Sequence, residues 1–266
     1  MRIITDSSAE FDPQEAKALN IQIVPLTVIF GGQAYLEGQD MPKDEFYEKL
    51  KSEFPHTSLP SAEEFKEEYL RCEGEETLVI LISSALSGTV NAARLAAQEF
   101  GNVRVYDSLC CTAMLRILVE TAVKNRERGV EEVVNILDGL RPRIRLYACL
   151  DTLEFLYKGG RIKKSVAIVG GLLGIKPYIT IPKEGTVVQA GRAHGQKKAL
   201  KMLSDALKTA DIDENYPVYF LQTDVDTPAR AVMKEVGREN DRIFRICCSV
   251  GSHIGPNAAG VVYVEK

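Results

Sequence analysis

The sequence predicts an α/β protein of two lobes, and three observations lead to this prediction. Short runs rich in β-branched and aliphatic residues alternate with longer segments of helical spacing, which is typical of parallel strands joined by helices. The 266 residues suffice for one large domain or two ordinary ones. After about residue 150 the pattern changes, and apolar runs around Gly185 predict a β-hairpin at 178–188. We therefore expect an N-terminal lobe at 1–150 and a C-terminal lobe at 151–266, with no flexible linker.

Each run then predicts one element of these lobes, from the period of its apolar residues. In the N-terminal lobe we expect strands at 21–30, 77–82, 103–106 and 146–150. Helical spacing at 43–52, 62–71, 89–99 and 113–127 predicts the helices between them. In the C-terminal lobe we expect helices at 194–209 and 228–239, and strands at 218–222, 243–249 and 260–264.

The composition argues against several classes of protein. The 33 basic and 37 acidic residues give a formal charge of −4, whereas nucleic-acid binding needs a clustered cationic excess. No apolar stretch approaches the roughly 20 residues that span a bilayer, so we expect no stable membrane insertion. Met1 to Asp6 reaches an acid before any signal-like apolar region, which predicts a cytoplasmic protein. Six cysteines without a C-x-x-C spacing, and three histidines, predict buried free thiols and no metal site.

The first segment that departs from generic patterning is Thr57-Ser58-Leu59-Pro60-Ser61. Ser61 and Glu64 have the spacing of a capping box, which predicts a structural role for Ser61. Thr57 and Ser58 lie upstream of this cap and are not needed by it. Their hydroxyls face a ligand or serve the turn, and this segment alone leaves both interpretations open.

The second segment, residues 83–89, is Ser-Ser-Ala-Leu-Ser-Gly-Thr and joins the most apolar strand to a helix. An ordinary N-cap needs one hydroxyl, for which Ser87 would suffice. The segment supplies four hydroxyls and a glycine at a helix amino terminus, where backbone N–H groups and the helix dipole favour an anion. It therefore indicates an anion-binding loop.

The third segment, residues 158–164, is Lys-Gly-Gly-Arg-Ile-Lys-Lys and includes Arg161. Paired glycines permit a close approach of the backbone, and the cations can hold a phosphate or a carboxylate. A solvent-exposed turn whose cations lie near a helix end would have the same sequence features, so both interpretations stay open. No G-x-x-x-x-G-K-[ST] sequence occurs in the chain, so this is not a nucleotide-binding P-loop.

The fourth segment places His253 just before a Gly-Pro turn, upstream of the last expected strand. A histidine in such a turn can contact a ligand or can serve as a hydrogen-bonded structural residue. We favour ligand contact.

In this order, the four segments resemble the DegV family of bacterial fatty-acid-binding proteins over nearly the whole chain. No single motif is decisive, but their number and order make the resemblance specific. The further matching segments are Thr5-Asp6-Ser7-Ser8 at the end of a first strand, Asp107-Ser108, Leu153, Ile175-Lys176-Pro177 and Gly191-Arg192.

The resemblance implies two α/β lobes with a long-chain fatty acid, such as palmitate, stearate or oleate, held in the interior between them. It implies carriage without catalysis or a cofactor, in fatty acid metabolism and lipid transport. Some members present the acid to a fatty acid kinase, which phosphorylates it. Arg192 matches an arginine that is important to this exchange, and it would contact the partner or a phosphate. The residues that would bind the carboxylate are Thr57, Ser87 and His253, with Ser58, Ser84, Gly88 and Arg161 as secondary candidates.

The chain departs from the family pattern at a few positions. Leu59 stands where glutamine is common, and Asn257 where glycine is usual. Ala193-His194-Gly195 replaces the basic residues around Arg192, which bears on the kinase contact more than on lipid binding.

Two other classes of function are alternatives to fatty acid carriage. A serine hydrolase would use Ser87 and His253 with an acid such as Asp6 or Asp107, but Ser87 is not in a G-x-S-x-G elbow. A phosphotransferase acting alone would need a nucleotide loop and metal-ligating carboxylates, and the sequence offers neither.

Overall fold

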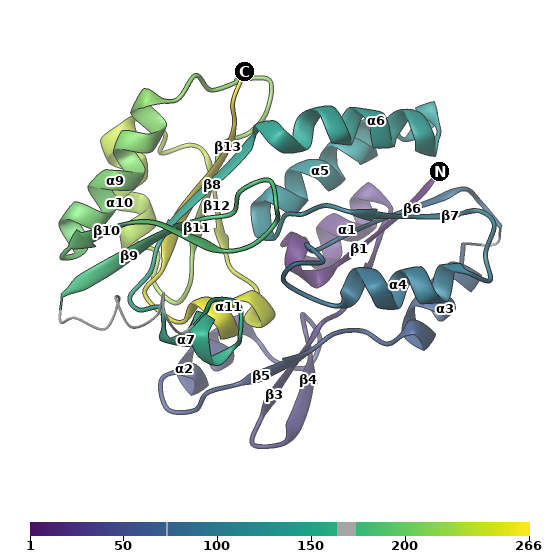
Figure 1. Ribbon diagram of the computed structural model, residues 1–266, viewed down its shortest axis with the longest axis horizontal. Coiled ribbons are helices and arrows are strands. Elements are labelled where there is room, and N and C mark those ends of the chain that lie inside the picture. The colour runs from purple at the N-terminus through teal and green to yellow at the C-terminus, as the bar shows by residue number, and fades with distance from the viewer. Residues whose placement is uncertain (73, 164–173) are drawn as a thin grey trace.

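A four-stranded parallel sheet forms the first layer of the structure, a computed structural model that describes residues 1–72, 74–163 and 174–266 (Figure 1). Its strands follow the order β2-β1-β6-β7. Because all of them run in parallel, the loops after β1, β6 and β7 leave from one edge of the sheet. The strands are β1 (Arg2–Asp6), β2 (Ile21–Val24), β6 (Thr77–Leu81) and β7 (Val103–Asp107).

Helices cover both faces of this sheet, because successive strand residues point to opposite sides. Ile4 packs with Phe65 of α3 on one face. Ile3 belongs to a larger core that contains Leu115 of α5 on the other face. The helices of this part are α1 (Pro13–Leu19), α3 (Ala62–Leu70), α4 (Thr89–Ala97), α5 (Thr112–Lys124) and α6 (Val130–Leu140), with 3-10 turns at Ser7–Ala9, Arg126–Arg128 and Arg141–Arg143.

A second, mixed sheet follows the order β10-β9-β8-β13-β11-β12, in which only β11 and β12 pair in parallel. Val261 of β13 packs with α9 and α10 on one face, whereas Val262 joins the core around α5 on the other. Helix α5 therefore lies between the two sheets (Figure 1). The elements are β8 (Ile144–Cys149), β9 (Ile175–Thr180), β10 (Val188–His194), β11 (Tyr219–Gln222), β12 (Arg242–Arg245), β13 (Ala259–Val264), α9 (Gln196–Thr209) and α10 (Thr227–Val236).

These layers confirm the predicted α/β class, and the hairpin expected at 178–188 is present. Strands β9 and β10 pair in antiparallel, with Val188 opposite Thr180. The helix predicted from residue 194 begins later, at Gln196, because β10 extends to His194. Among the described residues, no helix is both long and apolar enough to cross a bilayer.

The single strand expected at 21–30 is wrong, since the chain there contributes to two sheets. Strand β2 ends at Val24, and Pro25 has no N–H to continue the ladder. The N–H of Leu26 instead donates to the Ser7 hydroxyl at 3.0 Å. The chain then enters a small antiparallel sheet of order β4-β3-β5, with β3 (Thr27–Phe30), β4 (Gln33–Leu36) and β5 (His56–Ser58), beside α2 (Lys43–Leu50).

The strand expected at 243–249 is correct only in its first half. Strand β12 ends at Arg245, and α11 (Cys248–Ile254) begins three residues later. His253, expected just before a Gly-Pro turn, lies in the last turn of α11, which is capped by Gly255 with a φ of 75°. Helix α11 packs beside α7 (Glu154–Lys158) (Figure 1).

Two buried carboxylates explain why a helix forms at this point. One oxygen of Glu37 accepts the N–H of Cys248 at 2.9 Å, and the other accepts the N–H of Ser249 at 2.6 Å. Glu10 accepts the N–H of Cys247 at 2.9 Å. The first amides of a helix have no partner within it, and a negative charge there also complements the helix dipole. Glu10 and Glu37 therefore fix the start of α11.

This arrangement predicts that Glu37→Ala lowers the free energy of unfolding by about 1–3 kcal/mol, because two amides at a buried helix start lose their acceptors. Urea denaturation followed by circular dichroism measures the change. Glu48→Ala is the control, since Glu48 is an exposed residue of α2 paired with Lys51. We expect the control to stay within about 0.5 kcal/mol of the parent protein. A loss in Glu37→Ala no larger than in the control would contradict the anchoring role.

Candidate functional site

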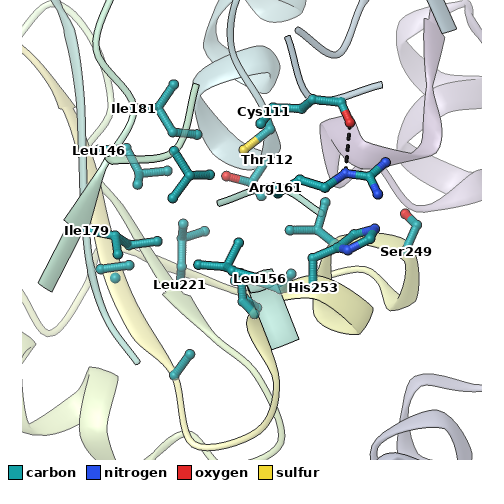
Figure 2. Close-up of a pocket in the computed structure, with 18 of the residues that line it drawn as sticks. Cys111, Thr112, Leu146, Leu156, Arg161, Ile179, Ile181, Leu221, Ser249 and His253 are labelled. Carbon is teal, nitrogen blue, oxygen red and sulfur yellow. Dashed lines mark hydrogen bonds between the residues drawn. The ribbon is translucent and has the colours of Figure 1, made fainter. Parts of the chain in front are cut away.

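A cavity lies between the inner face of the second sheet and the loops that leave the edge of the first sheet (Figure 2). Its volume, with its opening to solvent, is ≈ 840 Å³. Most of its lining is aliphatic, from side chains that include Leu146, Leu156, Ile179, Ile181, Leu221 and Ile254.

Polar side chains gather at one end of this cavity. Thr57 of β5 and His253 of α11 are 196 residues apart in sequence, yet the Thr57 Oγ1 and His253 Nε2 atoms lie 3.0 Å apart. Arg161, which follows α7, donates from Nε to the carbonyl of Leu86, the neighbour of Ser87. Figure 2 shows Arg161 and His253 on one side and aliphatic side chains on the other. We call the group Thr57, Ser87, Arg161 and His253 the polar end.

The imidazole of His253 is neutral at pH 7. Burial, together with the nearby positive charge of Arg161, lowers its pKa to about 4. Its Nδ1 atom is buried and has no hydrogen-bond partner in the described part of the chain. A Cβ atom on residue 159 would lie 2.1 Å from Nδ1, so Gly159 is required for this ring to fit. Gly159 of the basic segment thus permits the close approach of α7 to α11.

Arg161 is a half-buried cation without an acidic partner among the described residues. Its hydrogen bonds go to the carbonyl groups of Leu86 and Gly159, at 3.0 and 2.5 Å. Burial lowers the pKa of its guanidinium, which nevertheless stays charged at pH 7. A cation removed from water is stable only with an opposite charge or with polar groups around it. The polar end is therefore suited to an anion.

The loop that carries Ser87 is hydrogen-bonded to the turn between β9 and β10 of the second sheet. The Ser83 hydroxyl donates to the carbonyl of Gly185 at 2.9 Å, and Ser83 is fully buried. The N-cap of α4 is Gly88, which offers no side-chain cap. The Ser87 hydroxyl lies 2.8 Å from the Thr89 hydroxyl, and it also accepts the N–H of Thr89 at 3.4 Å. Ser87 thus both supports the helix start and lines the cavity.

The secondary candidates divide into two groups. Arg161 lines the cavity, whereas Ser58, Ser84 and Gly88 are not part of its lining. Ser58 and Ser84 are exposed, and the N–H of Ser84 donates to the Asp107 carboxylate at 3.1 Å. Ser61 forms the predicted capping box with Glu64 at the start of α3.

Arg192 lies apart from the cavity. It is exposed on β10, opposite Pro177 of β9, and within the described residues it makes no ion pair. Lys164, the last residue of the basic segment 158–164, is outside the described residues.

Two polar residues of the lining were missed by the sequence analysis, Thr112 and Ser249. Ser249 lies in the stretch expected as a strand, which hid its place on the cavity side of α11. Thr112 begins α5 inside an apolar run, and a single threonine in such a run carries no signal of its own.

The residues of the alternative hydrolase do not form a triad in this structure. Asp6 is engaged by the N–H groups of Ser8 and Ile82, and Asp107 by those of Ser84 and Leu109. Neither aspartate hydrogen-bonds to His253, which pairs with Thr57, and Ser87 pairs with Thr89. Over the described ranges, histidine, cysteine and acidic side chains form no cluster that could hold a metal ion.

Comparison with known proteins gives one consistent result. A family model described as uncharacterised proteins of the DegV family matches residues 1–266. A DegV domain-containing protein of Deinococcus radiodurans is 36% identical, and the alignment covers 97% of this chain and 96% of that protein. A structure described as fatty acid binding of a DegV family protein from Thermus thermophilus has 32% identity and a TM-score of 0.89, with 100% of both chains covered. A stearic acid-binding protein from Eubacterium ventriosum has 26% identity and a TM-score of 0.87, covering 100% of this chain and 99% of that one.

Proposed function

Because this chain belongs to the DegV family, we propose that it binds a long-chain fatty acid such as palmitate, stearate or oleate, and carries it without catalysis. The acyl chain occupies the aliphatic part of the cavity, and the carboxylate lies at the polar end. The single observation that carries the proposal is Arg161, a half-buried cation at the end of an apolar cavity with no acidic partner in the described part of the chain. The similar structures named for fatty acid binding support the same ligand class.

The energetics of the cavity agree with tight but reversible carriage. Burial of ~15 methylenes at ~0.8 kcal/mol each gives a gross gain of about 12 kcal/mol. Loss of translational and rotational freedom on binding offsets several kcal/mol of this gain. The net affinity therefore suits a carrier that must release its ligand.

Thr57, Ser87 and His253 would hold the carboxylate through hydrogen bonds. A carboxylate accepts from hydroxyl groups, and a neutral imidazole can donate from one nitrogen. Arg161 supplies the opposite charge from the other side of the carboxylate. Because the hydroxyl and imidazole donors are neutral, they stabilise the carboxylate without surrounding it by ion pairs. The head group can therefore be transferred to another protein.

We further propose that the carboxylate is presented to a fatty acid kinase. Thr57 and Ser87 are only partly buried, so the polar end lies near the protein surface and a partner's active site can approach it. Arg192 is exposed, and a guanidinium there can contact a phosphate or an acidic group of the partner.

Thr57→Val and Ser87→Ala test the carboxylate site. Each removes one hydroxyl donor to a charged acceptor, so we expect binding of stearic acid to weaken by about 1–2 kcal/mol. Isothermal titration calorimetry measures the affinity. Ser84→Ala is the matched control, because Ser84 lies in the same loop but is exposed and outside the cavity lining. Parental affinity in both site variants, with the fold intact, would move the carboxylate elsewhere.

Arg192→Ala separates carriage from presentation. We expect fatty acid affinity to stay unchanged, because Arg192 is not part of the cavity lining, and we expect the rate of kinase-dependent acyl phosphate formation to fall. Equilibrium binding and turnover with the cognate kinase are measured on the same preparations. Arg104→Ala is the control, an exposed arginine on β7 of the first sheet. Turnover in Arg192→Ala equal to that of Arg104→Ala would remove Arg192 from the partner contact.

A further inference from the structure

A second polar group, Thr112, faces the cavity away from the polar end. Thr112 lines the cavity and is 2% exposed. Its hydroxyl oxygen is buried and has no oxygen or nitrogen partner among the described residues; the thiol of Cys111, a weak donor and acceptor, lies beside it. In Figure 2 the Thr112 oxygen lies between the aliphatic side chains of Leu146 and Ile181 on one side and Arg161 on the other. If an acyl chain occupies the aliphatic part of the cavity, as proposed above, the hydroxyl lies beside it.

The backbone places Thr112 at the wall of the cavity. Thr112 is the first residue of α5, and its N-cap, Cys111, makes no side-chain cap. The φ of Thr112 is 49°, in the left-handed region that is strained for a β-branched residue. Cys111 and Thr112 both line the cavity at the start of a helix whose next residues are buried in the core, so the position of the Thr112 backbone at the cavity wall is fixed.

The aliphatic neighbours of Thr112 cannot pair with its hydroxyl, and the thiol of Cys111 is a weaker partner than an oxygen group would be. A buried hydroxyl without a partner is unfavourable, and a saturated acyl chain leaves it in that state. A hydroxyl on the chain would be desolvated in the same place, and the two groups could then pair with each other. When the two hydroxyls pair with each other, neither carries the cost of a buried polar group without a partner. When only one of them is present, that cost remains. The cavity thus has one polar position for a carboxylate and a second for a neutral polar group.

We infer that the preferred ligand is a fatty acid with a hydroxyl group on its chain, placed where it pairs with Thr112. This inference rests on the proposed function, because the carboxylate at the polar end sets how far along the chain that hydroxyl must be. It narrows the ligand from long-chain fatty acids in general to hydroxy fatty acids, with Thr112 as the residue that determines the preference.

The test compares stearic acid with a panel of octadecanoic acids that each carry one hydroxyl at a different carbon. Competition against a fluorescent fatty acid measures the affinities. We expect one region of the chain to give acids that bind the parent protein about tenfold more tightly than stearic acid, the factor that corresponds to about one hydrogen bond. Thr112→Val keeps the shape and removes the hydroxyl, so this preference should be lost. Thr112→Ser keeps the hydroxyl and should retain it.

The outcomes separate this inference from the proposed function. Failure of stearic acid and of every hydroxy acid to bind the parent protein would overturn the proposed function. Binding of stearic acid at least as tight as that of every hydroxy acid would overturn only the inference, as would a preference that survives in Thr112→Val. Thermal denaturation verifies that the variants fold. If Thr112→Val does not fold, the panel on the parent protein and Thr112→Ser still decides the question.

Discussion

The start of α11 is held by Glu10 and Glu37, two buried carboxylates that come from the N-terminal part of the chain, more than 200 residues away. Lys43 stabilises Glu10 from the other side and also donates to the carbonyl of Arg245, at the end of β12. These contacts connect the second sheet to a loop of the first sheet and to a loop of the small antiparallel sheet β4-β3-β5. Because α11 carries His253, they also decide where the polar end of the cavity forms.

Charge is distributed at the cavity in a way that favours an anionic ligand. The two carboxylates at the start of α11 accept hydrogen bonds from backbone N–H groups, and Glu10 also pairs with Lys43. At the other end of the helix, His253 is neutral, and the charge of Arg161 is not matched by an acidic side chain in the described residues. In the function proposed above, the carboxylate of the ligand would supply the negative charge that Arg161 lacks.

The elements of the fold were predictable where the local sequence pattern and the tertiary packing select the same secondary structure. The strand and loop at 77–89 were found because an apolar run, a cluster of hydroxyls and a glycine follow one another in sequence. The strand at 243–249 was wrong in its second half, because its apolar residues suit a strand or a buried helix equally. The groups that select the helix, Glu10 and Glu37, lie too far away in sequence for any local pattern to include them.

The candidate site was predictable to a different degree. Nothing in the spacing of Thr57 and His253, 196 residues apart, brings them together, and their pairing was expected only through the family resemblance. Arg161 was predicted only as a member of a basic cluster, and the absence of an acidic partner among the described residues is visible only in three dimensions. Thr112 gave no signal at all, since a buried hydroxyl becomes informative only when its surroundings are known.

Mass spectrometry of the protein as purified from bacterial cells tests the central claim most directly, because it detects the ligand without assuming its identity. Native spectra give the mass of the complex, and solvent extraction followed by lipid analysis identifies what was bound. The account predicts about one fatty acid per chain. Protein that is purified empty, and that takes up no fatty acid when stearic, oleic and hydroxy acids are added, would contradict it.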